Sequence, residues 1–135
     1  MEKRIVELRT MKPGRYVMVE DAPCKITGMT HSKPGKHGGA RVRIDAIGVF
    51  DDSRRSMIKP ASDKVETPVL EKKIAQVLAV VGDKLQMMDM TTYETFDIDV
   101  PTDPEVKAFI KDGAEVMYID WGGKKKITQA KGSQE

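Results

Sequence analysis

Apolar and polar residues alternate with a period of two along much of the chain, while helical periodicity is nearly absent. Turn-forming residues interrupt this alternation at intervals of roughly 8 to 12 residues. Such spacing is typical of short antiparallel strands that close into small barrels. The sequence therefore predicts an all-β fold.

The stretch ARVRIDAIGVF, residues 40–50, gives the clearest strand in the first half of the chain. Its apolar residues at positions 42, 44 and 46 are expected to face a core, which leaves Arg41 and Arg43 facing solvent. The alternation is lost near Gly48, where we expect a β-bulge. Upstream, the pattern predicts a hairpin formed by strands at 16–19 and 24–29.

The second half of the chain shows two hairpins and one helix. Glycine-containing turns at 82–83 and 122–123 separate apolar runs, as in two-residue hairpin connections. A helix is expected within 103–113, with Asp103 as the N-cap, Pro104 at the first helical position and a glycine at its end. The aromatic residues of the last hairpin, Trp121 and Tyr118, are expected in the core.

The sign of charge divides the chain into two parts. Residues 1–70 carry 14 Lys and Arg against 9 Asp and Glu, whereas residues 71–135 carry 9 against 12. About ten strands would also overfill one small barrel of this length. We therefore expect two barrels, at 1–69 and 70–135. A five-strand barrel with one helix is the OB arrangement and a bent barrel with a protruding hairpin is SH3-like, but periodicity does not decide between topologies.

Composition favours a soluble globular protein, with 39% hydrophobic and 33% charged residues. No apolar run approaches the roughly 20 residues that span a bilayer, and the first ten residues are too charged for a signal peptide. We expect a cytoplasmic protein without membrane contact. The single cysteine, Cys24, cannot form an internal disulfide and is expected to be a buried small side chain.

One window of the N-terminal half is free of acidic residues. It runs from Ala22 to Ile44 and resembles the electrostatic footprint of a polyanion-binding protein. A solvated basic edge is an equally good interpretation at this point. The cations of the window are Lys25, Lys33, Lys36, Arg41 and Arg43.

The segment SKPGKHGGA, residues 32–40, is the main candidate for chemistry in this window. Its GK pair resembles part of a phosphate-binding P-loop, but that motif needs glycine at 30 and Ser or Thr at 37. The sequence has Thr30 and His37, and no long helix follows. A P-loop is therefore excluded.

Metal binding and catalysis are also poorly supported. Cys24, His31 and His37 provide too few ligands for a structural zinc site, so no metal is expected. A Schiff-base lysine would need to be desolvated, whereas a glycine-rich tip exposes Lys36. The acidic residues form no converging pair that would serve as general acid and base. We expect a binding protein and not an enzyme.

Glycines on both sides of Lys36 make the tip of this segment slim. Gly35 and Gly38 lack a Cβ atom, so the walls of another macromolecule could approach the backbone and reach the lysine amine. Such a lysine would suit a modifying enzyme or a narrow cavity. The alternative is an ordinary long hairpin loop in which glycines only permit a turn.

The stretch SKPGKHGGAR closely resembles the hypusine loop of the translation initiation factor 5A family, usually written S-K-T-G-K-H-G-x-A-K. Pro34 replaces the common threonine and Arg41 replaces a lysine, and neither departure touches the lysine that the family modifies. The matching residues are Ser32, Lys33, Gly35, Lys36, His37, Gly38 and Ala40.

The resemblance covers nearly the whole chain. The stretches GVFDDSRR, TPVLEKKIAQVLAV and LQMMDMTTYET are similar to the corresponding parts of archaeal members. The absence of an N-terminal extension and of a terminal helix also favours the archaeal form. The resemblance implies an SH3-like N-terminal domain, residues 1–69, that carries the loop, and an OB-fold domain, residues 70–135.

The resemblance also implies a function. Deoxyhypusine synthase would transfer an aminobutyl group from spermidine to Lys36, and the protein itself would carry no cofactor. The modified lysine would enter the peptidyl-transferase centre of the large ribosomal subunit and position peptidyl-tRNA, most usefully at proline runs. Lys33, Arg41 and Arg43 would bind phosphates at the base of the loop. The alternative is an unmodified RNA-binding module or RNA chaperone.

Overall fold

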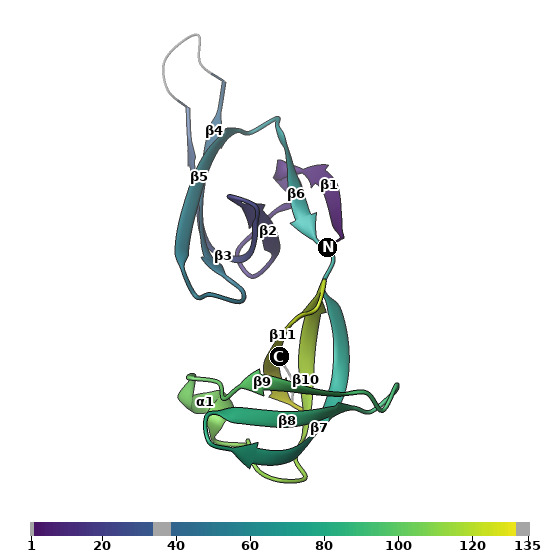
Figure 1. The fold of residues 1–135 in the computed structure, drawn as a ribbon. Coiled ribbons are helices and arrows are strands. Elements are labelled where there is room, and N and C mark those ends of the chain that lie inside the picture. The colour runs from purple at the N-terminus through teal and green to yellow at the C-terminus, as the bar shows by residue number, and fades with distance from the viewer. Residues whose placement is uncertain (1, 34–38, 132–135) are drawn as a thin grey trace. The chain divides into compact units, whose positions relative to one another are not determined.

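A computed structural model describes residues 2–33 and 39–131 of the chain (Figure 1). Strands dominate these residues, and α1 is a single helical turn. The elements in chain order are β1 (Lys3–Glu7), a 3₁₀ turn (Leu8–Thr10), β2 (Tyr16–Val19), β3 (Ala22–Ser32), β4 (Arg41–Gly48), β5 (Arg54–Pro60), β6 (Lys64–Pro68), β7 (Glu71–Val81), β8 (Lys84–Asp89), β9 (Thr95–Asp99), α1 (Pro104–Lys107), β10 (Glu115–Trp121) and β11 (Lys124–Ala130).

The chain forms two compact units, Met1–Val69 and Leu70–Glu135. Each unit has its own curled antiparallel sheet and its own hydrophobic core. The predicted fold class is confirmed: an SH3-like barrel is followed by an OB-fold barrel with one short helix. Among the described residues, no helix has the length and apolar character that crossing a membrane requires.

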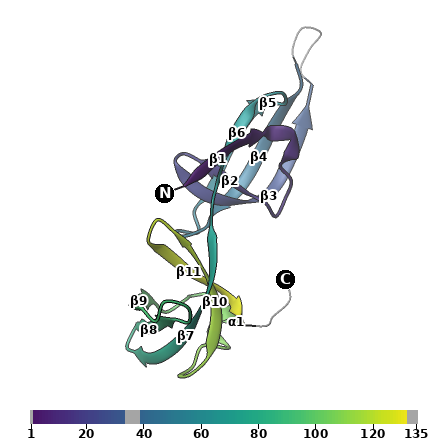
Figure 2. The ribbon, with the colours of Figure 1, turned by 90° about the vertical axis from the view of Figure 1, so that its right-hand side faces the viewer.

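The N-terminal unit is built on a four-stranded sheet in the order β2-β3-β4-β5, with β1 paired to β6 (Figure 2). β6 lies against β2, so the β1–β6 pair covers one side of the curled sheet. Alternate residues of β3 and β4 point into the core of this unit, because side chains of a strand alternate between its two faces. The buried core residues are Leu8, Met11, Val17, Val19, Cys24, Ile26, Val42, Ile44, Ala46 and Val65.

The bulge lies on β3 and not near Gly48, so the prediction placed it on the wrong strand. Pairing of β3 with β4 shifts between Ile26 and Gly28, while the β4–β5 register runs without interruption. The extra residue, Thr27, donates a 3.1 Å hydrogen bond from Oγ1 to the carbonyl of Asp45. A glycine in a strand marks either a bulge or a close approach, and Gly48 marks a close approach.

Gly48 makes room for an ion pair that closes the β4–β5 turn. Asp51 accepts two hydrogen bonds from the guanidinium of Arg55, at 3.0 and 2.7 Å, and one from the amide of Ser53 at 3.0 Å. A Cβ at position 48 would lie 1.9 Å from Oδ1 of Asp51 and 2.6 Å from Nη1 of Arg55. Only glycine fits here without displacing these side chains.

The C-terminal unit is a five-stranded sheet in the order β11-β10-β7-β8-β9. The hairpin turns expected at 82–83 and 122–123 are confirmed, because two residues lie between β7 and β8 and two between β10 and β11. Gly82, Gly122 and Gly123 all have positive φ angles, a conformation that glycine adopts without strain.

The helix of this unit is shorter than expected. Asp103 caps it as predicted, since its Oδ1 accepts a 2.9 Å hydrogen bond from the amide of Glu105. The helix ends at Lys107, and residues 108–113 form two turns joined by irregular backbone instead. Phe109 packs against the core of the barrel, so tertiary contacts determine this segment more than its helical periodicity does.

The core cluster of the C-terminal unit contains Tyr118, one of the two aromatic residues that the sequence assigned to the core, whereas Trp121 is buried outside this cluster. Tyr118 and Trp121 are buried, and the ring of Tyr118 packs at a tilt against that of Phe96, with 5.2 Å between their centroids. Other buried residues of this cluster are Ala75, Val77, Leu85, Met87, Val116 and Ile127. Asp89 is the buried charged residue in the described part of the chain.

Candidate functional site

The candidate site lies on the β3–β4 hairpin of the N-terminal unit. Ser32 ends β3 and Arg41 begins β4, and these two residues form the last pair of the ladder. Lys33 follows Ser32 and is exposed. The predicted modified residue, Lys36, lies outside the described residues, as do its predicted neighbours Gly35, His37 and Gly38.

The hairpin is anchored from the β4 side. Val42 and Ile44 are buried, with exposed fractions of 2% and 0%, while Arg41 and Arg43 are exposed, as the alternation predicted. On β3 the last three residues, Thr30–Ser32, are exposed. The hairpin therefore leaves the core as it approaches the Ser32–Arg41 pair, and two apolar side chains of β4 hold its base.

The backbone next to the loop is also fixed to β5. The amide of Ala61 donates a 2.8 Å hydrogen bond to the carbonyl of Ala40, and Arg41 pairs with Pro60. The chain that enters β4 is thus bonded on one side to β3 and on the other to the end of β5. Both ends of the segment 33–40 start from ordered strands, which suits a loop that must be presented in a defined direction.

Arg41 and Arg43 project from the same side of β4, because alternate residues of a strand share a face. The guanidinium Nε of Arg43 lies 3.1 Å from Oδ1 of Asp45, and both side chains of this pair are about half exposed. An exposed ion pair of this kind is weak and yields readily to a stronger anion. Arg41 makes no ion pair within the described residues.

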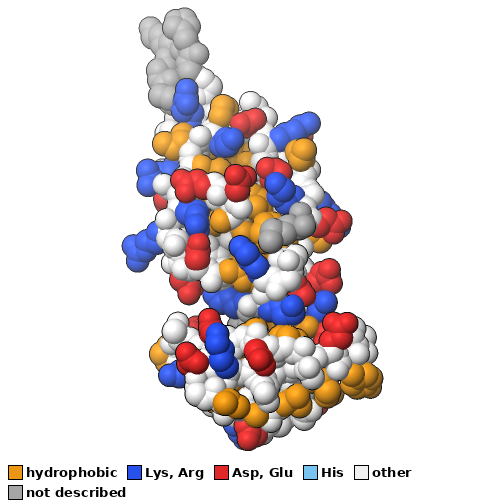
Figure 3. Space-filling model, in the orientation of Figure 1, with side chains coloured by type: hydrophobic (Ala, Val, Ile, Leu, Met, Phe, Trp, Pro, Cys, Tyr) orange, Lys and Arg blue, Asp and Glu red, His pale blue; other side chains and the backbone are white. Residues whose placement is uncertain are grey.

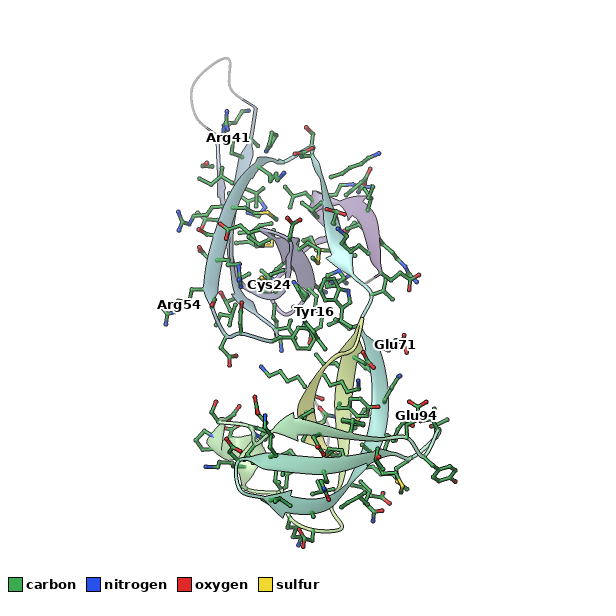
Figure 4. The ribbon with its side chains drawn as sticks, viewed as in Figure 1. Tyr16, Cys24, Arg41, Arg54, Glu71 and Glu94 are labelled. Atoms are coloured by element: carbon green, nitrogen blue, oxygen red, sulfur yellow. The ribbon has the colours of Figure 1, made fainter. Side chains whose placement is uncertain are left out.

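The sequence interpretation missed one cation of this region, Arg54. It begins β5, is exposed, and pairs with Ile47 of β4, which places it on the same side of the sheet as Arg43. Figure 4 shows Arg41 and Arg54 at opposite ends of this sheet, with Cys24 inside its curve. The charge pattern gave no signal for Arg54, because it lies ten residues beyond the acid-free window.

Of the residues considered for metal binding, Cys24 and His31 lie far apart, and His37 lies outside the described residues. Cys24 is fully buried and its Sγ lies 3.4 Å from the carbonyl of Ala22, whereas His31 is exposed near the far end of the same strand. The two residues are seven positions apart along the strand, a separation of about 20 Å. Among the described residues, no three His, Cys, Asp or Glu side chains form a group that could hold a metal ion.

The two carboxylates with lowered pKa values, Asp89 and Asp51, accept hydrogen bonds that stabilise the fold. The hydrogen bond from Tyr118, followed by the amide of Thr92, lowers the pKa of Asp89 to about 2. The guanidinium of Arg55 similarly holds the pKa of Asp51 well below its usual range. Both groups remain ionised near neutral pH and accept hydrogen bonds, so neither is arranged to transfer a proton.

Comparisons with known proteins agree with this architecture. Residues 4–63 match the family described as translation initiation factor 5A-like, N-terminal. The chain is 48% identical over 126 residues to translation initiation factor 5A of Methanopyrus kandleri, covering 93% of each protein. It is 45% identical over 136 residues to that of Pyrococcus furiosus, covering 99% of each.

A solved structure is similar over nearly the whole chain. The eukaryotic translation initiation factor 5A from Methanococcus jannaschii gives a TM-score of 0.86 at 40% identity, covering 95% of this chain and 94% of that one. The similarity thus extends through both units. This chain belongs to the translation initiation factor 5A family, a family of translation factors and not of enzymes.

Proposed function

We propose that this protein acts in the cytoplasm, binds the large ribosomal subunit beside the P-site tRNA and promotes peptide-bond formation through a hypusine or deoxyhypusine residue at position 36. Membership of the translation factor family supports the general role. The observation that carries the specific role is the sequence SKPGKHGGA between the paired ends of β3 and β4. A slim, glycine-flanked lysine on a fixed hairpin suits delivery of a cation into a narrow crevice.

The proposed modification lengthens Lys36. Deoxyhypusine synthase forms a bond between the lysine Nζ and the butyl carbon of spermidine, and the bond from that carbon to the secondary amine of spermidine breaks. Propane-1,3-diamine leaves, so one amine replaces another and there is no net oxidation. The product carries two cationic nitrogens and reaches further than any encoded side chain.

The proposed mechanism is positioning. The extended cation lies along the CCA end of peptidyl-tRNA and holds the donor substrate in a reactive orientation, which accelerates a reaction without a catalytic group. Lys33, Arg41 and Arg43 contact phosphates near the base of the loop; all three are exposed. Substrates that orient badly, such as consecutive prolines, gain most.

A Lys36→Arg variant tests this function. Arginine keeps the charge but cannot accept the aminobutyl group, so we expect loss of stimulation when a reconstituted translation system reads a proline run. Lys33→Arg is the matched control, because it changes a neighbouring exposed lysine and leaves the modification site intact. Full activity of the Lys36→Arg protein would show that the proposed function is wrong.

A second candidate is an RNA-binding module that acts without modification. The exposed arginines on β4 favour it, because phosphate contacts do not require a lengthened lysine. The mass of the protein isolated from its own host separates the two candidates. A gain of one aminobutyl group on Lys36 supports the first, and an unmodified lysine in a host that makes spermidine supports the second.

A further inference from the structure

One side of the β3-β4-β5 sheet gathers cations that are far apart in the sequence. Lys25 on β3 and Arg54 on β5 both pair with Ile47 of β4, and cross-strand partners point to the same side. Arg43 and Arg41 follow on this side at two-residue steps along β4. We call this surface the outer face and define it by Lys25, Thr27, Arg41, Arg43, Asp45, Arg54 and Ser56.

The outer face is strongly positive for its size. It carries four cations and one acid, Asp45, which is already paired with Arg43. In the described part of the chain, Lys25, Arg41 and Arg54 make no ion pair. Figure 3 shows Lys and Arg side chains along the left margin of the N-terminal unit, where Figure 1 places β4 and β5. Uncompensated, exposed charge of one sign attracts a polyanion.

A shallow depression lies on the outer face between two of its arginines. Arg43 and Arg54 border it, the hydroxyl-bearing residues Thr27 and Ser56 lie beside them, and Ile47 contributes an apolar wall. Asp45, the ion-pair partner of Arg43, also lines it. Arginine presents a planar fork of donors that matches the oxygens of a phosphate. The depression therefore has the donors that a phosphate group needs and an apolar wall against which a ribose could pack.

The length of the outer face points to a chain of anions and not to a single ion. Arg41 and Ile47, the partner of Arg54, are six residues apart on β4, a separation of about 20 Å. The cations are thus distributed along the sheet. A phosphodiester backbone, with its regularly repeated charges, can contact all of them at once.

We propose that the outer face binds the phosphate backbone of RNA, with Lys25 and Arg54 as contacts at the end away from the Ser32–Arg41 pair. This inference rests on the proposed function, which makes RNA the polyanion that the protein meets. It extends the interface from Arg41 and Arg43 across the full length of the sheet. An acidic protein is the competing occupant, and the experiment distinguishes it.

The test is the salt dependence of binding to a fluorescein-labelled single-stranded RNA oligonucleotide, measured by fluorescence anisotropy. Lys25→Gln and Arg54→Gln should each reduce the slope of log K against log salt by about 0.7, the contribution of one lost phosphate contact on a single strand. Arg4→Gln is the matched control: Arg4 is an exposed cation on β1, outside the four-stranded sheet. It should leave the slope unchanged.

The protein for this test is prepared without the modifying enzyme, so its outcome does not depend on the modification of Lys36. The outer face can therefore bind RNA even if the proposed function at the ribosome fails. The proposed function can likewise hold if the outer face does not bind RNA. The activity of Lys36→Arg and the salt slopes of Lys25→Gln and Arg54→Gln are measured in separate assays.

The Asp45→Asn variant should change the affinity for RNA in the opposite direction. It removes the one acid of the outer face and frees Arg43, so RNA affinity should rise in this variant while it falls in Arg54→Gln. The proposal is overturned if wild-type protein shows no salt-dependent RNA binding, or if Lys25→Gln and Arg54→Gln behave like Arg4→Gln. It is also overturned if labelled polyglutamate binds the outer face as tightly as the RNA does.

Discussion

The hydroxyl of Tyr118 on β10 donates a 2.6 Å hydrogen bond to Oδ2 of Asp89 at the end of β8. Asp89 is only 4% exposed, and its other oxygen accepts bonds from the amides of Thr91 and Thr92 at 2.8 and 2.9 Å. One carboxylate thus ties the β8–β9 turn to the core of the barrel. Removing either partner leaves a buried polar group with fewer hydrogen bonds.

Tyr118→Phe should destabilise the C-terminal unit by about 1.5 to 3 kcal/mol, the usual value of a hydrogen bond to a charged group. Urea unfolding followed by the fluorescence of Trp121, the one tryptophan in the chain, measures this unit. Tyr93→Phe is the matched control, because Tyr93 is 68% exposed. Equal stability of the two variants would show that the Tyr118–Asp89 bond contributes nothing.

The same carboxylate predicts how the C-terminal unit responds to acid. The pKa of Asp89 is about 2 in the folded protein against an ordinary value of 3.8. Its stabilising effect is complete above about pH 4 and is lost as the pH falls toward 2, since the unfolded chain takes up the proton first.

The free energy of unfolding, measured by Trp121 fluorescence between pH 7 and pH 2, should therefore fall more steeply in wild-type protein than in Asp89→Asn. Asp97→Asn changes an exposed carboxylate of β9 and should keep the wild-type slope. If Asp89→Asn and wild type lose stability in parallel, Asp89 does not contribute to acid sensitivity.

Gly48→Ala should destabilise the N-terminal unit by about 1 to 3 kcal/mol, the usual cost of an overpacked site. The new methyl group would collide with Asp51 and Arg55 and displace their ion pair. Hydrogen exchange of the amides of β4 and β5 measures the effect, which should include faster exchange of the amide of Ser53.

Gly28→Ala is the control for this substitution. Gly28 lies in the neighbouring strand β3, and a Cβ there meets no atom within 4 Å. It should leave the exchange rates of β4 and β5 close to those of the wild-type protein. If both alanine variants are equally tolerated, the Asp51–Arg55 pair does not need the space at position 48.

Cys24 should be unreactive in the native protein. Its side chain is fully buried, and burial raises the pKa of its thiol, so little thiolate is available near neutral pH. A thiol-specific reagent should label it rapidly only after unfolding in urea. Rapid labelling without denaturant would mean that the N-terminal core opens on the timescale of the reaction.

Much of the architecture could be predicted from local sequence. Period-two alternation determined which side of β4 is buried, so Val42 and Ile44 were assigned to the core and Arg41 and Arg43 to the surface. Glycine-containing dipeptides located the turns at 82–83 and 122–123. These features depend on residues that are near neighbours in the chain, and local sequence carries that information directly.

Contacts between strands could not be predicted in this way. The sequence placed a bulge at Gly48 because the alternation stops there, but the register of β3 against β4 places the extra residue at Thr27. The helix beginning at Pro104 was expected to continue toward Gly113, but packing of Phe109 against the barrel competes with helical hydrogen bonding. Each outcome depends on a neighbour that is distant in sequence.

The sequence by itself determined the strand pattern, the all-β class and the glycine-flanked Lys36, because each of these depends on residues that are close together in the chain. Tertiary structure alone decided that Arg54 lies on the same face as Lys25 and that Tyr118 reaches Asp89. Strand register brings such residues together, and register is set by pairing across the whole sheet, which no short stretch of sequence specifies.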